Sequence, residues 1–337
     1  MGVDTYGATG AVQGETAGRI GAGGLSRLGL GVGLDMPWGG RVGFSTTGGS
    51  QGGDGVTPAV REFLERRLGA FSYLFFSFQP RDYGPLEAAR YYAAYDDICG
   101  LLPADMPRVF HHTRLNIGNP EPFDKEETAR FTNDLIARYG FSWVVEDLGI
   151  WSFRGKSLPY PLPPLLTPEG REMCVEHATQ WRRLLDAPIS IEFPGFTEGG
   201  TFCLGHENAF QYFSDVVETA DVLATIDIGH IISYQWIRGV QGEAALRELE
   251  LLPLDRCIEF HLSGCQIVGN KFRDLHHGIL LDEQLELLEH LLPLCPNLIG
   301  VTYEDPVFDN RGDFAPKTVP NYLRLADITE RWCEDAR

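Results

Sequence analysis

The sequence predicts a closed α/β barrel of the (β/α)8 type, because short apolar runs of strand length alternate eight times with segments of helical spacing. A parallel sheet requires this alternation, since every strand must be followed by a crossover before the next one starts. Eight such units close a barrel. The apolar runs are, in order, residues 28–33, 73–78, 108–110, 143–145, 189–191, 222–226, 257–260 and 298–303.

The segments between these runs repeat apolar residues at helical spacing. They predict helices over residues 58–68, 86–102, 125–139, 168–185, 207–220, 243–251, 282–292 and 319–334. The clearest start is at Thr167 and Pro168, because Thr is a good N-cap and Pro suits the first helical position. Residues 157–166, just before it, contain too many prolines for a strand or a helix, so we predict an extended loop. This loop follows the fourth strand on the active-site face, where it would either hold an extended peptide or pack over the rim.

Two glycine-rich stretches lie outside these elements. We expect residues 1–27 to form a flexible tail, because they have no apolar period with which to build a core. Residues 46–55 follow the first strand and would form a surface loop or a lid at the barrel mouth. Gly29, Gly31 and Gly33 lie inside the first strand rather than at a strand-to-helix turn. They therefore make no dinucleotide-binding fingerprint, and we expect them to relieve crowding inside the barrel.

The composition suits one barrel domain over residues 28–337, since the chain has 337 residues and 43% of them are hydrophobic. A net charge of −19 opposes binding to nucleic acid, whose phosphates attract Lys and Arg. No apolar run approaches the roughly 20 residues that span a bilayer, so no membrane partner is expected. The amino terminus lacks a secretory signal, which predicts a cytoplasmic protein. The seven cysteines include no C-x-x-C pair, and their odd number argues against a disulfide framework.

Most predicted strands end in a residue that could bind a metal. One such acid is more often a helix cap, but caps repeated over many strands would include Ser, Thr and Asn rather than only acids and His. Because a (β/α)8 barrel builds its active site from the carboxyl ends of its strands, we expect these side chains to meet. The candidate metal ligands are His111, Glu146, Asp147, Glu192, Asp227, His230, His261, Asp274, His276 and Glu304.

These nitrogen and oxygen donors suit Fe, Mn or Zn, and no thiolate is among them. Their number exceeds the three or four protein ligands of a single site, which predicts two or three ions. The register of the segment around Asp274 leaves either His276 or His277 as the ligand. The sequence thus predicts a metalloenzyme rather than a barrel that only binds a partner.

The order and strand-end placement of these residues resemble the multinuclear non-haem iron-dependent oxidases. The resemblance is carried by residues 110–111, 145–147, 191–192, 227–230, 260–264, 274–276 and 302–304, and by the segment 149–169 that leads into the fourth helix. The chain departs from the family at Asp147, where a His is usual, and at Phe193, where an Asn is usual. It also carries His230 where many members have Asn.

The resemblance implies a xylose-isomerase-like barrel that uses O2 and two or three iron ions in mixed Fe(II)/Fe(III) states. The implied reaction modifies an amino-acid residue, with a Cys, Asp or Asn side chain, in a ribosomally made peptide during natural-product biosynthesis. The implied partner is therefore a peptide or amino-acid substrate, which a small partner protein often delivers to family members. Glu192, Asp227 and His261 are the implied catalytic residues, with Glu192 as a bridging ligand.

A second interpretation is a divalent-metal sugar isomerase or epimerase, or a hydrolase, of the wider xylose-isomerase-like superfamily. The D-x-G-H strand end at residues 227–230 is common in that superfamily. An isomerase would need a Lys or His beside the hydroxy-ketone, and no predicted strand ends in Lys. The negative charge argues against a nuclease.

Overall fold

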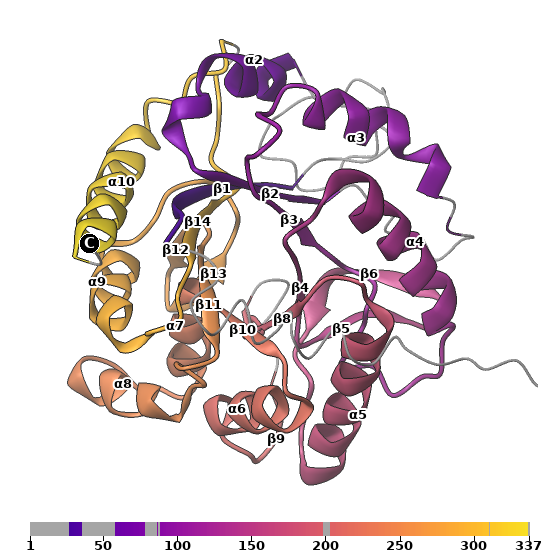
Figure 1. Ribbon diagram of the computed structural model, residues 1–337. Coiled ribbons are helices and arrows are strands. Elements are labelled where there is room, and N and C mark those ends of the chain that lie inside the picture. Colours follow the sequence, from indigo (N-terminus) through magenta and orange to yellow (C-terminus); the bar gives the residue numbers. More distant parts are fainter. Residues whose placement is uncertain are drawn as a thin grey trace, which may run out of the picture.

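The computed structural model contains a closed barrel with helices around it (Figure 1). It describes residues 27–35, 58–77, 86, 88–197, 203–309 and 311–335. The predicted tail, apart from residue 27, and the predicted mouth loop at residues 46–55 lie outside the described residues. In the described part of the chain, no helix is long and apolar enough to cross a bilayer.

All eight predicted strands are present and form the barrel, which confirms the predicted fold class. They are parallel and close in the order β1-β14-β11-β10-β8-β4-β3-β2. Their bounds are β1 Gly29–Asp35, β2 Tyr73–Ser77, β3 Arg108–His111, β4 Trp143–Asp147, β8 Ile189–Glu192, β10 Leu223–Asp227, β11 Cys257–Leu262 and β14 Gly300–Glu304.

The described helices are α2 Pro58–Arg66, α3 Tyr92–Cys99, α4 Lys125–Tyr139, α5 Pro168–Leu184, α6 Ala209–Ala220, α7 Ile228–Ile237, α8 Glu243–Arg247, α9 Asp282–Leu291 and α10 Val319–Glu334. Short 3-10 turns lie at Leu68–Ala70, Ala88–Arg90, Leu249–Leu251 and Leu292–Leu294. The predicted cap of α5 is confirmed, because the Thr167 side chain accepts the N–H of Gly170 at 3.1 Å. Helix α7 was not predicted, because most of its residues are apolar and no periodic polar face marks it.

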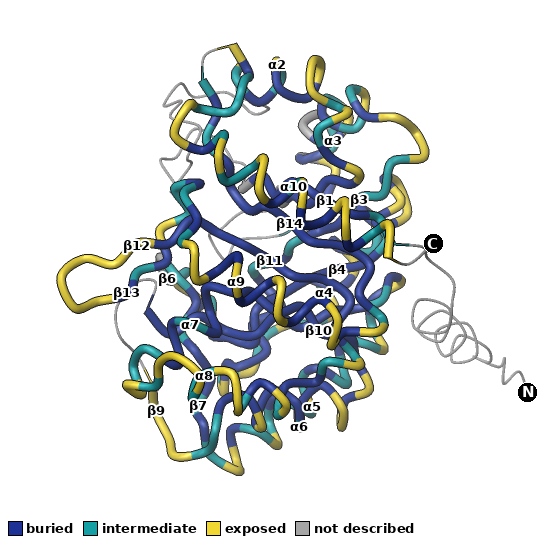
Figure 2. Tube along the Cα trace, turned by 90° about the vertical axis from the view of Figure 1, so that its left-hand side faces the viewer, coloured by how far each residue is buried: buried dark blue, intermediate teal, exposed yellow. Residues whose placement is uncertain are grey.

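Two antiparallel hairpins follow barrel strands at the carboxyl end of the barrel. They pair β5 (Ile150–Phe153) with β6 (Lys156–Leu162), and β12 (Cys265–Val268) with β13 (Lys271–Asp274). Two residues of β7 (Leu165–Leu166) pair with β9 (Leu204–Gly205). Figure 2 shows the exposed tip of the β12–β13 hairpin projecting beyond the barrel.

The prediction that residues 157–166 contain no strand is wrong, because β6 and β7 both fall within them. Pro159 and Pro161 lie where the β5–β6 register shifts, between the pairs Ser152–Ser157 and Ile150–Leu162. A proline has no N–H to donate to a ladder, so it is tolerated at such an irregularity. The hairpin therefore keeps its strand character despite the proline content.

The barrel floor is filled by aromatic rings that occupy the space left by glycines. A Cβ on Gly31 would lie 2.3 Å from the Tyr73 ring, and one on Gly300 would lie 2.6 Å from the same ring. A Cβ on Gly33 would lie 2.9 Å from Phe75. The prediction that glycines of the first strand relieve crowding is therefore confirmed for Gly31 and Gly33. It is wrong for Gly29, where the nearest described atom to an added Cβ would lie at 3.5 Å and the backbone φ is 91°.

We expect Gly31→Ala to lower the free energy of unfolding by about 1–3 kcal/mol, the usual cost of overpacking a core. The Tyr73 ring cannot easily retreat, because its hydroxyl lies 3.1 Å from Glu259 and 2.7 Å from Thr302. The measurement is urea unfolding followed by tryptophan fluorescence. Gly69→Ala is the control, since no atom of the described residues lies within 4 Å of its added carbon. Equal stability of the two variants would contradict this description of the floor.

Candidate metal centre

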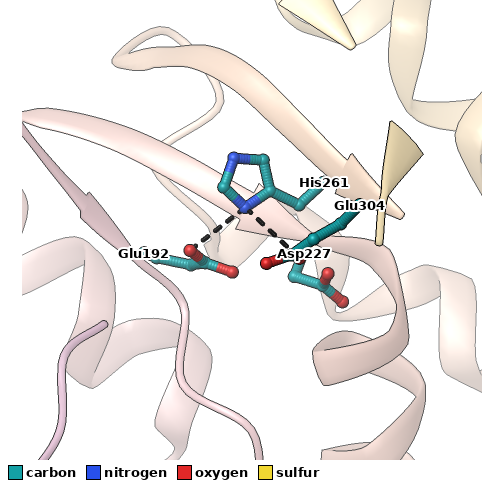
Figure 3. Close-up of side chains that lie close together, drawn as sticks. All are labelled: Glu192, Asp227, His261 and Glu304. Atoms are coloured by element: carbon teal, nitrogen blue, oxygen red, sulfur yellow. Dashed lines mark ion pairs between the residues drawn. The ribbon is translucent and has the colours of Figure 1, made fainter. Parts of the chain in front are cut away.

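Four strands direct their last inward side chains to one place at the carboxyl end of the barrel (Figure 3). The residues are Glu192 on β8, Asp227 on β10, His261 on β11 and Glu304 on β14, and all four are buried. One potential ligand atom from each lies within 4.8 Å of the others. His261 Nδ1 is 3.1 Å from Glu192 Oε2 and 3.9 Å from Glu304 Oε2. We call these four residues the central group.

Three further groups of ligand atoms surround the central group, and each shares one carboxylate with it. The shared residues are Glu192, Asp227 and Glu304. A carboxylate has two oxygens, so a shared one can contact two ions at once. The outer groups are His111, Asp147 and Glu192; Asp227, His230 and Asp274; and His276, Glu304 and Asp305.

The structure brings nine of the ten predicted ligands into these groups. The exception is Glu146, which precedes Asp147 on β4 and faces the opposite side of the sheet because side chains alternate along a strand. Its carboxylate accepts the backbone N–H groups of Arg114 and Leu115 at 3.1 Å and that of Asn116 at 2.9 Å. Glu146 therefore holds the loop after β3 and does not join the centre.

Sequence reasoning missed one member of these groups, Asp305. It directly follows Glu304, and the sequence signal was an acidic pair at a strand end, as at Glu146 and Asp147. Its Oδ2 lies 3.0 Å from Nδ1 of His276. Both residues have left-handed backbones, with φ of 46° and 47° respectively. Such strain is typical of functional sites.

Between the two candidates that the sequence left open, His276 is the one that faces the centre. Its Nε2 is 3.7 Å from Asp274 Oδ1. His277 instead uses Nδ1 to accept the N–H of Ile279 at 3.3 Å. Of the two neighbouring histidines at the end of β3, likewise, one faces the centre and the other does not. His111 joins the groups, whereas the buried His112 lies on the other face, where its Nε2 is 2.9 Å from Thr132 Oγ1.

His230 is held in one tautomer by the backbone. Its Nδ1 lies 2.7 Å from the carbonyl oxygen of Phe193, which can only accept, so Nδ1 carries the proton. In the neutral ring the lone pair is then on Nε2, which lies 3.4 Å from Asp274 Oδ2. The Phe193 side chain points away from the centre and packs among Phe196, Phe210 and other aromatic rings. The Phe193 ring, which departs from the family pattern, therefore lies outside the site.

The electrostatics of the groups favour bound cations. Burial raises the pKa of Asp227 to about 7 and that of Glu304 to about 8, and neighbouring carboxylates add to both shifts. Burial also acts on Glu192 and Asp274, but the nearby imidazoles outweigh it and lower each pKa to about 2. The pKa of His261 lies well above its usual range, because the attraction of Glu192 and Glu259 exceeds the effect of burial. The carboxylates therefore compete for positive charge, which a metal ion would supply.

The donor atoms themselves fit a metal. Asp227 Oδ2 and His261 Nδ1 are buried and have no hydrogen-bond partner among the residues that the structure describes. Buried polar groups of this kind are normally satisfied, so they indicate a missing partner. The groups offer six carboxylates and four imidazoles and, within the described residues, no thiolate. This donor set suits iron, manganese or zinc.

Comparison with solved structures gives the same fold class. A mannonate dehydratase from Streptococcus suis serotype 2 is 12% identical, with a TM-score of 0.51 over 92% of this chain and 95% of that chain. A sugar phosphate isomerase/epimerase from Parabacteroides distasonis is 13% identical, with a TM-score of 0.48 over 89% and 96%. A xylose isomerase domain protein from Planctomyces limnophilus is 12% identical, with a TM-score of 0.44 over 90% and 96%. At these identities the likeness shows the fold alone, a closed barrel of eight parallel strands.

No curated protein matches the sequence. One family model does match it, over residues 91–304, which is more than half of the chain. The match confirms the family resemblance drawn from the sequence. The chain belongs to the family of RiPP precursor modification enzymes described as MbnB/TglH/ChrH, which act on ribosomally made peptides.

Proposed function

We propose that this protein is a multinuclear, iron-dependent oxidase that uses O2 to modify an amino-acid residue of a ribosomally made peptide. The observation that carries the proposal is the overlap of four groups of His and carboxylate ligands at one end of the barrel. Membership of the peptide-modifying family supports the peptide as substrate. The substrate residue we propose is a Cys, Asp or Asn.

Two or three ions fit the donor set better than one. A single site uses about three or four protein ligands, whereas the four groups contain ten residues. We assign Glu192, Asp227 and Glu304 as bridging ligands, because each belongs to the central group and to one outer group. The terminal ligands are then His111, Asp147, His230, His261, Asp274, His276 and Asp305.

Iron bound in such a centre would supply the one-electron chemistry that activates O2. The protein's own residues set where this happens. The side chains of His111 and His276 are 15% and 28% exposed, whereas that of His261 is fully buried. Substrate therefore reaches the centre from the side of His111 and His276. Phe75 lies beneath the centre, with its ring centroid 4.9 Å from that of His111 and 4.7 Å from that of His261. This ring excludes water from the floor of the site.

Glu192, Asp227 and His261 are the residues that we assign to catalysis. All three belong to the central group, which links the outer groups to one another. Any of the ten residues that is not coordinated would be placed to accept a proton from the substrate. Delivery of the peptide by a small partner protein is part of the proposal.

The metal content gives the first test. We expect protein purified without oxygen and reconstituted with iron to hold two or three iron ions per chain, with Mössbauer spectra of coupled Fe(II) and Fe(III). Stoichiometric zinc or manganese, with no coupled iron, would contradict the oxidase and favour the isomerase or hydrolase interpretation. Elemental analysis of the same samples measures the ions per chain.

Adjacent acids on β4 offer a matched test of the ligand assignment. We expect Asp147→Asn to lower the iron content, because it removes a charged ligand from one outer group. Glu146→Gln should keep the wild-type iron content while lowering the melting temperature, since its carboxylate serves three backbone N–H groups.

Glu192→Ala and Asp227→Ala extend this test to the shared carboxylates. Each should abolish metal loading and leave the circular dichroism spectrum of the folded barrel intact. Wild-type iron content in either variant would remove that residue from the site. Equal iron loss in Glu146→Gln and Asp147→Asn would show that loading depends on general stability rather than on the assigned ligands.

A further inference from the structure

A carboxylate that none of the ligand groups includes lies in the barrel floor directly behind His261. Glu259 is fully buried, and its Oε1 is 3.5 Å from Nε2 of His261. We propose that Glu259 is a positioning residue for the metal centre, which accepts the Nε2–H of His261 and so directs the Nδ1 lone pair at the central group. The inference rests on the proposed metal centre and goes beyond it by assigning a residue that binds no ion.

The strand geometry explains how two consecutive residues of β11, Ile258 and Glu259, both point into the barrel. The pairing of β10 with β11 shifts between Ala224–Cys257 and Thr225–Glu259, so Ile258 is an extra residue on β11. Such a β-bulge reverses the alternation of side chains that follows it. Ile258 packs in the apolar cluster inside the barrel, and Glu259 and His261 also point inward. The bulge therefore aims both the imidazole and the carboxylate at the barrel axis.

Three side chains from other strands hold the Glu259 carboxylate in place. Trp143 on β4 donates its indole N–H to Oε2 at 2.7 Å. Thr302 on β14 donates to Oε1 at 2.6 Å, and the Tyr73 hydroxyl on β2 lies 3.1 Å from the same oxygen. A carboxylate oxygen has about two acceptor sites. The Tyr73 hydroxyl also lies 2.7 Å from Thr302 Oγ1 and can donate there instead, which leaves Oε1 one acceptor site for His261. A fixed acceptor of this kind leaves the imidazole one orientation.

The two nitrogens of His261 face different surroundings. Nδ1 faces the central group, 3.1 Å from Glu192, whereas Nε2 faces Glu259. A neutral imidazole carries one proton, and Glu259 favours the tautomer that has it on Nε2. At 3.5 Å the contact is longer than a usual hydrogen bond, and Nε2 has no hydrogen-bond partner among the described residues. A cation on Nδ1 would make the Nε2–H more acidic and strengthen the contact, as carboxylates behind metal-bound histidines do.

A purely structural role explains Glu259 less well. Apart from the three side chains that hold the Glu259 carboxylate, the nearby floor is apolar, with Ile258, Leu223 and Ile299 in one cluster. Replacing a buried charge by a packed apolar residue is often neutral or stabilising, so packing alone does not require a carboxylate. The position beside His261 gives the carboxylate a function that an apolar residue could not have.

The test is a double-mutant cycle on metal affinity, with Co2+ as the probe and the full chain as the protein. Glu259→Gln should raise the free Co2+ concentration at half-loading by about 10–100-fold, the usual effect of losing the carboxylate behind a metal-bound histidine. It should also change the visible absorption of bound Co2+. In a His261→Ala background the same substitution should change neither, because Glu259 acts only through His261.

Glu146→Gln is the matched control, since it also replaces a buried glutamate, one that accepts three backbone N–H groups and faces the opposite side of the sheet from the centre. It should lower the melting temperature without changing the Co2+ affinity. Three results would overturn the inference: equal affinity of Glu259→Gln and wild type, equal loss of affinity in Glu259→Gln and Glu146→Gln, or a full Glu259→Gln effect without His261. Wild-type protein that binds no Co2+ or iron would instead overturn the proposed metal centre.

Discussion

Six carboxylates and four imidazoles are brought together at one end of this barrel, and the free energy of removing them from water constrains the rest of the site. Burial and mutual repulsion disfavour the ionised carboxylates, which raises the pKa of Asp227 to about 7 and that of Glu304 to about 8. Bound cations would relieve both effects. The need for positive charge explains why buried acceptors such as Asp227 Oδ2 lack a hydrogen-bond partner in the described chain.

The barrel makes this cluster possible through the common direction of its strands and the alternation of their side chains. Parallel strands end on the same side, and alternation puts every second side chain on the axis. Asp147 and Glu146 are adjacent in sequence, yet one joins the centre and the other caps the backbone N–H groups of a loop. Where alternation alone would fail, the bulge in β11 restores the inward direction for Glu259 and His261. The floor then supports the site, because Tyr73, Trp143 and Thr302 surround the carboxylate behind His261.

The departures from the family pattern have different structural consequences. Asp147 stands where a His is usual and lies with His111 and Glu192, so it offers a carboxylate oxygen where the family pattern has an imidazole nitrogen. Phe193 turns its ring into the layer outside the barrel and contributes only its carbonyl oxygen, which fixes the tautomer of His230. The centre is therefore altered at Asp147 and preserved at Phe193.

The sequence by itself determined the eight strands, most of the helices and nine of the ten clustered side chains, because apolar periodicity and strand-end acids are local signals. It missed helix α7, whose largely apolar composition has no polar face, and strand β6, whose prolines lie at a register shift. Only the tertiary structure decided the facing of Glu146, the membership of Asp305 and the place of Glu259. The facing of Glu146 depends on the phase of its strand, and the place of Glu259 depends on a bulge that pairing with a strand distant in sequence reveals. Asp305 follows the last residue of β14, and its acidic pair with Glu304 did not show that a left-handed backbone brings both side chains to the centre.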